Sequence, residues 1–154
     1  SGIMQGQEVT WMPSYGPEMR GGTCNCSVVI SDEAIGSPVI NDADVAICLN
    51  QPSMEKFENS IKPGGVLIID SSLVHIKPKR TDIRFIPMNA SDIASELGNM
   101  AFATISMLGC LSEATKCFSR DSFEASLREV LPERRHHLIP GNLEAFDKGA
   151  SFAK

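Results

Sequence analysis

Short apolar runs separated by turn-forming residues dominate the first ninety positions of the chain. Two of them, residues 44–50 (DVAICLN) and 64–70 (GGVLIID), are continuous runs rich in Val, Ile and Leu. This pattern is typical of strands that helices cover on both faces of a parallel sheet. Three more runs predict strands at residues 8–12, 24–31 and 83–88.

The segment between the two continuous runs predicts a short helix. Pro52 stands at a first-turn position, apolar residues follow at 54, 57 and 61, and a Pro-Gly-Gly stop comes after them. Strand, helix and strand in this order predict a right-handed βαβ unit with parallel strands.

The period changes at Ser91, which together with Glu96 marks the start of a helical pattern. Residues 91–118 are apolar nearly all round, so we expect a helix that is buried or lies at a subunit interface. An amphipathic helix is predicted at residues 121–132, and another at 142–154 with Asn142 as its N-cap. No repeat or domain boundary interrupts the pattern, so a single domain over residues 1–154 is predicted.

Gly6 has the position of a helix C-terminal stop, although almost no chain precedes it. An α/β domain of this kind ordinarily opens with a strand, a glycine turn and a helix. We therefore expect an α/β fold with a three-layer, Rossmann-like, mostly parallel sheet and flanking helices, from which the first βα unit is missing. This interpretation makes the chain a domain truncated at its N-terminus.

Composition narrows the functional classes. The 154 residues carry 14 basic and 19 acidic side chains, a net charge of −5, which argues against a nucleic-acid binder. The apolar runs are too short for a membrane span and no signal peptide opens the chain, which favours a cytoplasmic protein. The five cysteines have neither C-x-x-C nor zinc-site spacing, so we expect reduced thiols, no metal site and no iron–sulfur cluster on this chain alone.

The most unusual segment connects the first two predicted strands. Pro13 and Pro17 restrict the backbone, while Gly16, Gly21 and Gly22 permit conformations closed to other residues. The predicted result is a rigid, irregular loop at a strand end, which is where open α/β sheets bind ligands.

The side chains of this loop suit an anionic ligand. Arg20 offers a planar fork for phosphate or carboxylate, and Glu18 can orient it. Tyr15 adds a flat apolar face with a hydroxyl group, and the backbone N–H groups of Gly21 and Gly22 can approach an anion. The alternative, in which Glu18 and Arg20 pair at the surface and the glycines only build a turn, stays open.

Other polar clusters predict less. His75, the basic run 77–80 and the RRHH run 134–137 are each interpreted as solvated or structural positions. Ser71 and Ser72 lack a Gly-x-Ser-x-Gly context, so a hydrolase is not expected.

Three stretches together resemble a known family: PSYGPEMRGGTCNCSVVISDEAIGSP, ADVAICLNQPSMEKFENSIKPGGVLIIDSSLV and ELGNMAFATISMLGCL. They are similar to the gamma subunit of 2-oxoacid:ferredoxin oxidoreductases, and the resemblance covers nearly the whole chain. The family's glycine-rich opening turn is absent. The sequence around Trp11 and at residues 18–26 resembles the 2-oxoisovalerate and 2-oxoglutarate branches of the family more than the pyruvate branch.

The resemblance implies a subunit that is inactive alone and carries no catalytic residue. Such enzymes decarboxylate a 2-oxoacid on thiamine diphosphate, pass electrons through iron–sulfur clusters to ferredoxin, and release an acyl-CoA. Thiamine diphosphate, Mg and the clusters are expected on partner subunits, and this chain is expected to help accommodate CoA and to dock on those subunits.

The residues carried over by position, together with two residues at the end of a buried strand, give the predicted cofactor-contact set: Tyr15, Gly16, Glu18, Arg20, Gly21, Gly22, Asn50 and Gln51. Asn50 and Gln51 precede a helix N-terminus, a natural position for an anion or polar ligand. Two rival interpretations stay open. One is a stand-alone Rossmann-type nucleotide-binding domain, and the other is a pure assembly module whose loop serves only for docking.

Overall fold

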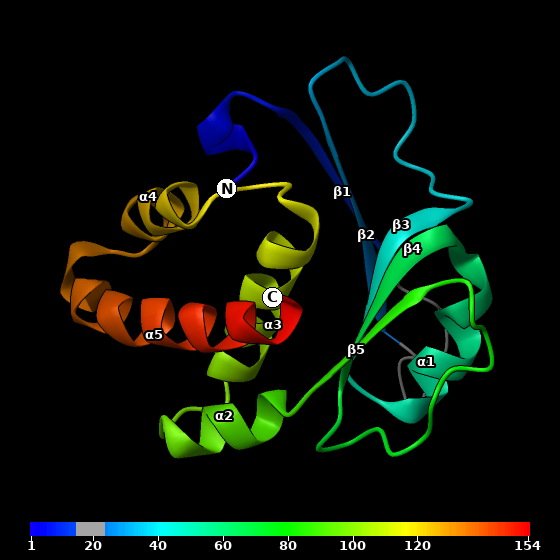
Figure 1. The fold of residues 1–154 in the computed structure, drawn as a ribbon. Coiled ribbons are helices and arrows are strands. Elements are labelled where there is room, and N and C mark those ends of the chain that lie inside the picture. Colours follow the sequence, from blue (N-terminus) through cyan, green and yellow to red (C-terminus); the bar gives the residue numbers. More distant parts are fainter. Residues whose placement is uncertain (15–23) are drawn as a thin grey trace.

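A parallel three-stranded sheet forms the centre of the chain, and the computed structural model describes residues 1–14 and 24–154 (Figure 1). The strand order is β3 (Ala43–Cys48), β4 (Ile61–Asp70) and β5 (Arg84–Met88). Helix α1 (Gln51–Phe57) and the 3-10 turn Glu58–Ser60 connect β3 to β4, and these strands pair in parallel. The predicted βαβ unit with parallel strands is confirmed.

Strand β4 is the middle of the core because its side chains alternate between two apolar layers. Val66 and Ile68 belong to a cluster with residues of the C-terminal helices, whereas Leu67 and Ile69 belong to a cluster with Met54 of α1. Both faces of the strand are therefore covered, which explains why its sequence is a continuous apolar run instead of an alternating one.

Helices lie on both sides of the sheet and complete three layers (Figure 1). One side carries α1, and the other carries α2 (Ala90–Glu96), α3 (Phe102–Thr115) and α5 (Ile139–Ala150). Helix α4 (Arg120–Val130) packs on α5 through a small aromatic cluster of Phe118, Phe123 and Phe146. Within the described ranges, no helix is both long and apolar enough to cross a membrane.

Helices α3 and α5 touch backbone to backbone. A Cβ atom on Gly109 would overlap the carbonyl group of Phe146, and one on Gly149 would overlap the carbonyl group of Ser106. Both glycines are thus required by space and not by backbone conformation. This contact holds the outer helix α5 tightly against α3 and the sheet.

The first two strands form a separate ribbon. Strand β1 (Glu8–Ser14) pairs with β2 (Asn25–Ser31) in an antiparallel two-stranded sheet, and Ser14 and Asn25 are the last register partners. The predicted strand positions hold, and the parallel order is confined to β3, β4 and β5. Gly6, with φ of 80°, is the left-handed C-cap of a single 3-10 turn, Ile3–Gln5.

Two helix predictions need correction. The pattern over residues 91–118 is not one helix, because Gly98 takes a φ of 76° and separates α2 from α3. Asn142 is not an N-cap: α5 begins at Ile139, and the Asn142 side chain donates to the Leu138 carbonyl at 2.8 Å inside the helix. The 3-10 helix η3 (Glu133–Leu138), which contains the RRHH run, leads directly into α5.

Candidate functional site

A buried carboxylate organises the carboxyl edge of the parallel sheet. Asp70, the last residue of β4, is fully buried, and its side chain accepts hydrogen bonds from the Ser91 hydroxyl at 2.5 Å, from the Ser91 N–H at 3.3 Å and from the Ser72 N–H at 3.1 Å. Asn89, the N-cap residue of α2, makes no side-chain capping bond. Asp70 therefore supplies from β4 the acceptor that the start of α2 lacks, as the helix dipole favours.

A cavity of about 300 Å³ lies beside this edge, between the ends of β4 and β5 and the loop that follows β4. Its polar lining comes from Ser71, His75 and Lys77, and its apolar lining from Ile69, Val74, Ile76, Phe85 and Pro87. The mixture of one cation, one imidazole and an apolar floor suits a small anion with an apolar part. The sequence analysis interpreted His75 as a structural or solvated position and gave Ser71 no catalytic role. The structure places both residues in the lining of this cavity.

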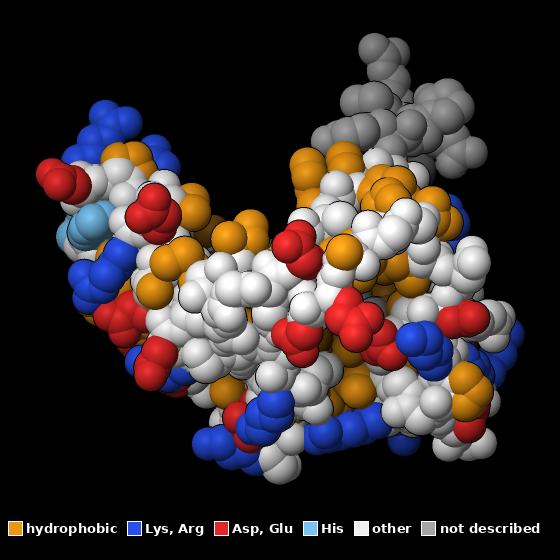
Figure 2. Space-filling model, turned by 90° about the horizontal axis from the view of Figure 1, so that it is seen from above, with side chains coloured by type: hydrophobic (Ala, Val, Ile, Leu, Met, Phe, Trp, Pro, Cys, Tyr) orange, Lys and Arg blue, Asp and Glu red, His pale blue; other side chains and the backbone are white. Residues whose placement is uncertain are grey.

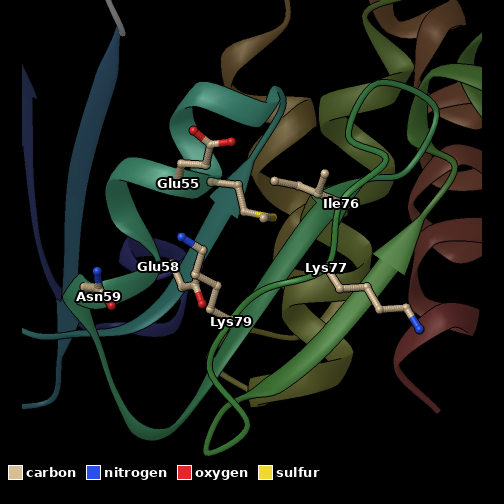
Figure 3. A pocket seen from close by; sticks show the side chains of 7 residues that line it. Glu55, Glu58, Asn59, Ile76, Lys77 and Lys79 are labelled. Carbon is tan, nitrogen blue, oxygen red and sulfur yellow. The ribbon is translucent and has the colours of Figure 1, made fainter.

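A second, smaller cavity of about 160 Å³ lies between α1 and the same loop (Figure 3). Glu55, Glu58 and Asn59 line it from the helical side, and Ile76, Lys77 and Lys79 line it from the loop. Acidic and basic groups thus face one hollow, which leaves little net charge for attracting an ionic ligand.

Arg80 fixes the loop that borders both cavities. Its backbone N–H donates to the buried Glu58 carboxylate at 2.7 Å, and its guanidinium donates to the carbonyls of Glu58 and Ile61 and to the Asp82 carboxylate. The prediction of a wet basic run at residues 77–80 is therefore wrong for Arg80. The sequence around Arg80 gave no sign of this role, because the Glu58 and Ile61 acceptors lie some twenty residues earlier in the chain and only Asp82 is a near neighbour.

Asn50 and Gln51 stand where the sequence placed them, between β3 and α1. Asn50 is the N-cap of α1, and its side-chain oxygen accepts from the Ser53 N–H at 2.9 Å. Gln51 donates to Glu55 one turn later at 3.0 Å. Both side chains are thus engaged within the helix, and their contact with a cofactor stays a prediction. The other predicted contact residues lie outside the described part of the chain: Tyr15, Gly16, Glu18, Arg20, Gly21 and Gly22.

The two buried cysteines, Cys48 and Cys110, are unsuited to nucleophilic chemistry. Burial raises the pKa of the Cys48 thiol, and likewise that of Cys110, to about 11, so both are protonated near neutrality. Cys24 and Cys26 are exposed, and Cys117 is half-buried. Across residues 1–14 and 24–154, no group of three or more His, Cys, Asp or Glu side chains is arranged to hold a metal ion.

One face of the β1–β2 ribbon consists entirely of apolar and thiol side chains. The register pairs Val9 with Ile30, Trp11 with Val28 and Pro13 with Cys26, and alternation places these three pairs on the same face. We call these six residues the ribbon face. Sequence reasoning missed this surface, although its signal is an ordinary one: a period of two across the strand pair.

Residues 2–152 match the family model described as pyruvate ferredoxin/flavodoxin oxidoreductase. The chain belongs to this family. The resemblance seen in the three sequence stretches is confirmed over almost the full length.

Relatives of this chain contain the similar segment either as most of a protein or as part of a longer one. The 2-oxoglutarate synthase subunit KorC of Methanocaldococcus jannaschii is 36% identical over 99% of this chain and 81% of its own length. The ketoisovalerate oxidoreductase subunit VorA of Methanothermobacter marburgensis is 34% identical over 97% of this chain. The chain spans only 31% of the length of that VorA, so the similar segment is part of a much longer polypeptide there.

Solved structures agree with the family assignment. The gamma subunit of a keto/oxoacid ferredoxin oxidoreductase from Geobacter sulfurreducens has a TM-score of 0.80 and 29% identity, covering 98% of this chain and 83% of its own. A 2-oxoglutarate:ferredoxin oxidoreductase from Magnetococcus marinus, with 2-oxoglutarate, coenzyme A and succinyl-CoA bound, has a TM-score of 0.81 and 25% identity. The match covers 99% of this chain and 28% of that one, and it confirms the Rossmann-like α/β fold.

Proposed function

We propose that the chain is the non-cluster, gamma-type part of a thiamine diphosphate-dependent 2-oxoacid:ferredoxin oxidoreductase that converts a 2-oxoacid and CoA to an acyl-CoA and CO₂. The observation that carries the proposal is the family match over residues 2–152, with named relatives that are subunits of such enzymes. Ferredoxin accepts the electrons through the assembled complex. The chain works in the cytoplasm, where its partners and CoA are available.

A 2-oxoglutarate or 2-oxoisovalerate enzyme is favoured over a pyruvate enzyme. The relatives at 34–36% identity carry the names ketoisovalerate oxidoreductase and 2-oxoglutarate synthase. A common gamma subunit of pyruvate and ketoisovalerate oxidoreductases from Thermococcus litoralis is 24% identical. The test is a panel of 2-oxoacids offered to the assembled complex with CoA and ferredoxin, in which pyruvate turns over more slowly than the other two.

The loop between the ribbon strands is proposed to contact CoA. Tyr15, Glu18 and Arg20 supply an aromatic face, a carboxylate and a guanidinium, and the guanidinium suits the phosphates of CoA. The neighbouring glycines Gly16, Gly21 and Gly22 allow close backbone approach, and Asn50 and Gln51 are included as nearby polar groups in the sequence-based proposal.

The Arg20→Ala variant of the assembled complex tests this role. Loss of a charged hydrogen bond predicts a KM for CoA raised roughly 10-fold or more, with the complex intact. Arg128→Ala is the control, because Arg128 is exposed and pairs only with Glu124 among the described residues. If the loop serves docking instead, Arg20→Ala co-purifies poorly with its partners, and wild-type behaviour in both assays would remove the loop from the proposal.

The isolated chain separates this function from its rivals. It is expected to show no flavin, thiamine or iron chromophore and no turnover by itself. Tight binding of NAD or FAD would favour a stand-alone nucleotide-binding domain. A complex in which CoA leaves hydrogen exchange of residues 15–22 unchanged would favour a pure assembly module.

A further inference from the structure

The ribbon face is apolar on the side where a strand pair ordinarily carries polar residues. Trp11 keeps 61% of its surface exposed and Val28 keeps 48%, and Cys26 is exposed as well. On the opposite face of the same strands, the Thr10 hydroxyl is buried and has no hydrogen-bond partner among the described residues. The ribbon thus buries the Thr10 hydroxyl and leaves Trp11 and Val28 largely exposed.

The chain itself already covers the end of the ribbon face that carries the Val9–Ile30 pair. A Cβ atom on Gly2 would lie 3.0 Å from the Val9 Cγ2 atom and 3.2 Å from the Ile30 Cγ2 atom, so the N-terminal turn packs on that end. The same turn reaches α4 through Gln5, whose side-chain oxygen accepts from Ser119 N–H at 2.7 Å and from the Ser122 hydroxyl at 2.8 Å. The ribbon is therefore braced against the helical half, and this turn leaves the Trp11–Val28 pair exposed in the described part of the chain.

One side of the molecule is concave. Figure 2 shows the surface hollowed between the helical half on the left and the strand-bearing half on the right, with hydrophobic side chains on both sides of the hollow. Neighbouring exposed apolar side chains, such as Trp11 and Val28 on the ribbon face, mark interaction sites in soluble proteins. A single large aromatic residue at the centre of such a surface is the usual anchor of an interface.

The relatives indicate one partner that is available to cover it. The same segment makes up 31% of VorA and 28% of the Magnetococcus marinus chain, yet 83% of the Geobacter sulfurreducens gamma subunit. The domain therefore occurs both joined to a larger body and as a separate subunit. A separate subunit has no covalent link to hold it, so it needs a stable surface for that same body.

We propose that the ribbon face, centred on Trp11 and Val28, is the docking surface for the larger remainder of the oxidoreductase, the body that VorA carries on the same polypeptide. The partner is expected to present an apolar surface of its own that encloses the Trp11 indole. This inference rests on the proposed function, since it assumes that the chain assembles into such an enzyme.

The test uses this chain and the companion subunits from the same organism that are similar to the part of VorA outside the matching segment. Affinity is measured by interferometry for wild type, Trp11→Ala, Val28→Lys and the control Val130→Lys. Val130 is 78% exposed at the end of α4, so the control places the same apolar-to-cationic change away from the ribbon. Removal of an interface anchor predicts binding roughly 30-fold weaker or more for both ribbon variants, and binding within about twofold of wild type for the control.

Cys26 gives a second readout that needs no mutation. Its thiol is exposed on the ribbon face, so iodoacetamide is expected to label it in the free chain and to label it much more slowly in the complex. Protection of Cys26 supports the proposal even if a ribbon variant folds poorly, a defect that circular dichroism of the free variants reveals.

Three results would overturn the inference. If the wild-type complex forms and the ribbon variants bind equally well with Cys26 unprotected, the docking face lies elsewhere while the proposed function stands. If the free chain is a dimer that Val28→Lys dissociates, a second copy is the occupant. If the wild-type chain binds none of the companion subunits, the proposed function fails together with the inference.

Discussion

The Asp70 carboxylate and the Ser91 hydroxyl are joined by a hydrogen bond of 2.5 Å that ties the end of β4 to the first turn of α2. The two residues are 21 positions apart in the chain, and the bond is partly buried together with two backbone bonds to the same carboxylate. It sets where the helical layer begins relative to the sheet, and so determines the shape of the carboxyl edge.

Replacing Asp70 with Ala is expected to lower the free energy of unfolding by about 2–4 kcal/mol. The change leaves the Ser91 hydroxyl and two N–H groups without their acceptor in a buried position. Urea unfolding measures the loss. Asp44→Ala serves as the control, because Asp44 is exposed and pairs with Lys62 at the surface, and it is expected to cost less than about 1 kcal/mol.

Gly149→Ala is expected to destabilise the chain by about 2 kcal/mol or more, despite the better helix propensity of Ala. Its methyl group would collide with the Ser106 carbonyl of α3, so α5 has to move away from its neighbour. Thermal unfolding followed by circular dichroism checks this. Gly36→Ala is the control, because a Cβ on Gly36 meets nothing within 4 Å, and it is expected to melt within a few degrees of wild type. Equal melting temperatures of the two variants would contradict the close contact between Gly149 and Ser106.

The Arg80–Asp82 pair predicts a pH-dependent contribution to stability. The hydrogen bond from Arg80 holds the pKa of the Asp82 carboxyl below its ordinary value of 3.8. A depressed pKa means that the stabilisation is complete above the unfolded value and is lost as the pH falls through the folded one. Wild type is therefore expected to exceed Asp82→Asn in stability at neutral pH, and the difference is expected to shrink in acid below the unfolded value.

Urea unfolding of both proteins at neutral pH and near pH 3 measures this difference. Asp42→Asn is the control, since Asp42 is exposed and takes part in none of the ion pairs formed by the described residues. If the difference in free energy of unfolding between wild type and Asp82→Asn is the same at both pH values, the Arg80–Asp82 pair makes no pH-dependent contribution to stability.

The thiols are expected to react in two classes under native conditions. Cys24 and Cys26 are exposed and should be alkylated first at neutral pH, whereas Cys48 and Cys110 are buried, with pKa values raised to about 11. Mass spectrometry after timed iodoacetamide treatment, with and without urea, measures the order of alkylation. Labelling of Cys48 as fast as Cys26 in the native chain would contradict the buried core.

Folding raises the pKa values of the Cys48 and Cys110 thiols. The contribution of these two thiols to stability is therefore complete below the ordinary value of 9 and is lost as the pH rises toward 11.

The βαβ unit was predictable because burial on both faces leaves a direct trace in the sequence. Val66 to Ile69 are apolar without interruption since alternate residues meet different helical layers, and Asn50 and Pro52 mark the start of the helix between the strands. Local patterns of this kind need no knowledge of distant residues.

The features that sequence reasoning missed depend on contacts between distant segments. The sequence shows Asp70 only as the end of a strand, because its partner Ser91 lies 21 residues later. Likewise, it shows Arg80 only as one more surface cation, because Glu58 and Ile61, which accept its hydrogen bonds, lie about twenty residues earlier. Gly98 is a different case, because the pair Gly98–Asn99 is a local helix-stop signal that the sequence interpretation passed over.

Strand β5, paired on one side with β4, has Pro87 near its centre. Proline has no amide hydrogen, so a foreign strand aligned along this border would lack a donor at the middle of its ladder. Pairing of another strand with the free edge of β5 is therefore disfavoured, whether that strand belongs to a companion subunit or to another copy of this chain. At this border, contacts with other proteins are therefore left to side chains, where shape and chemistry can select one companion and reject the rest.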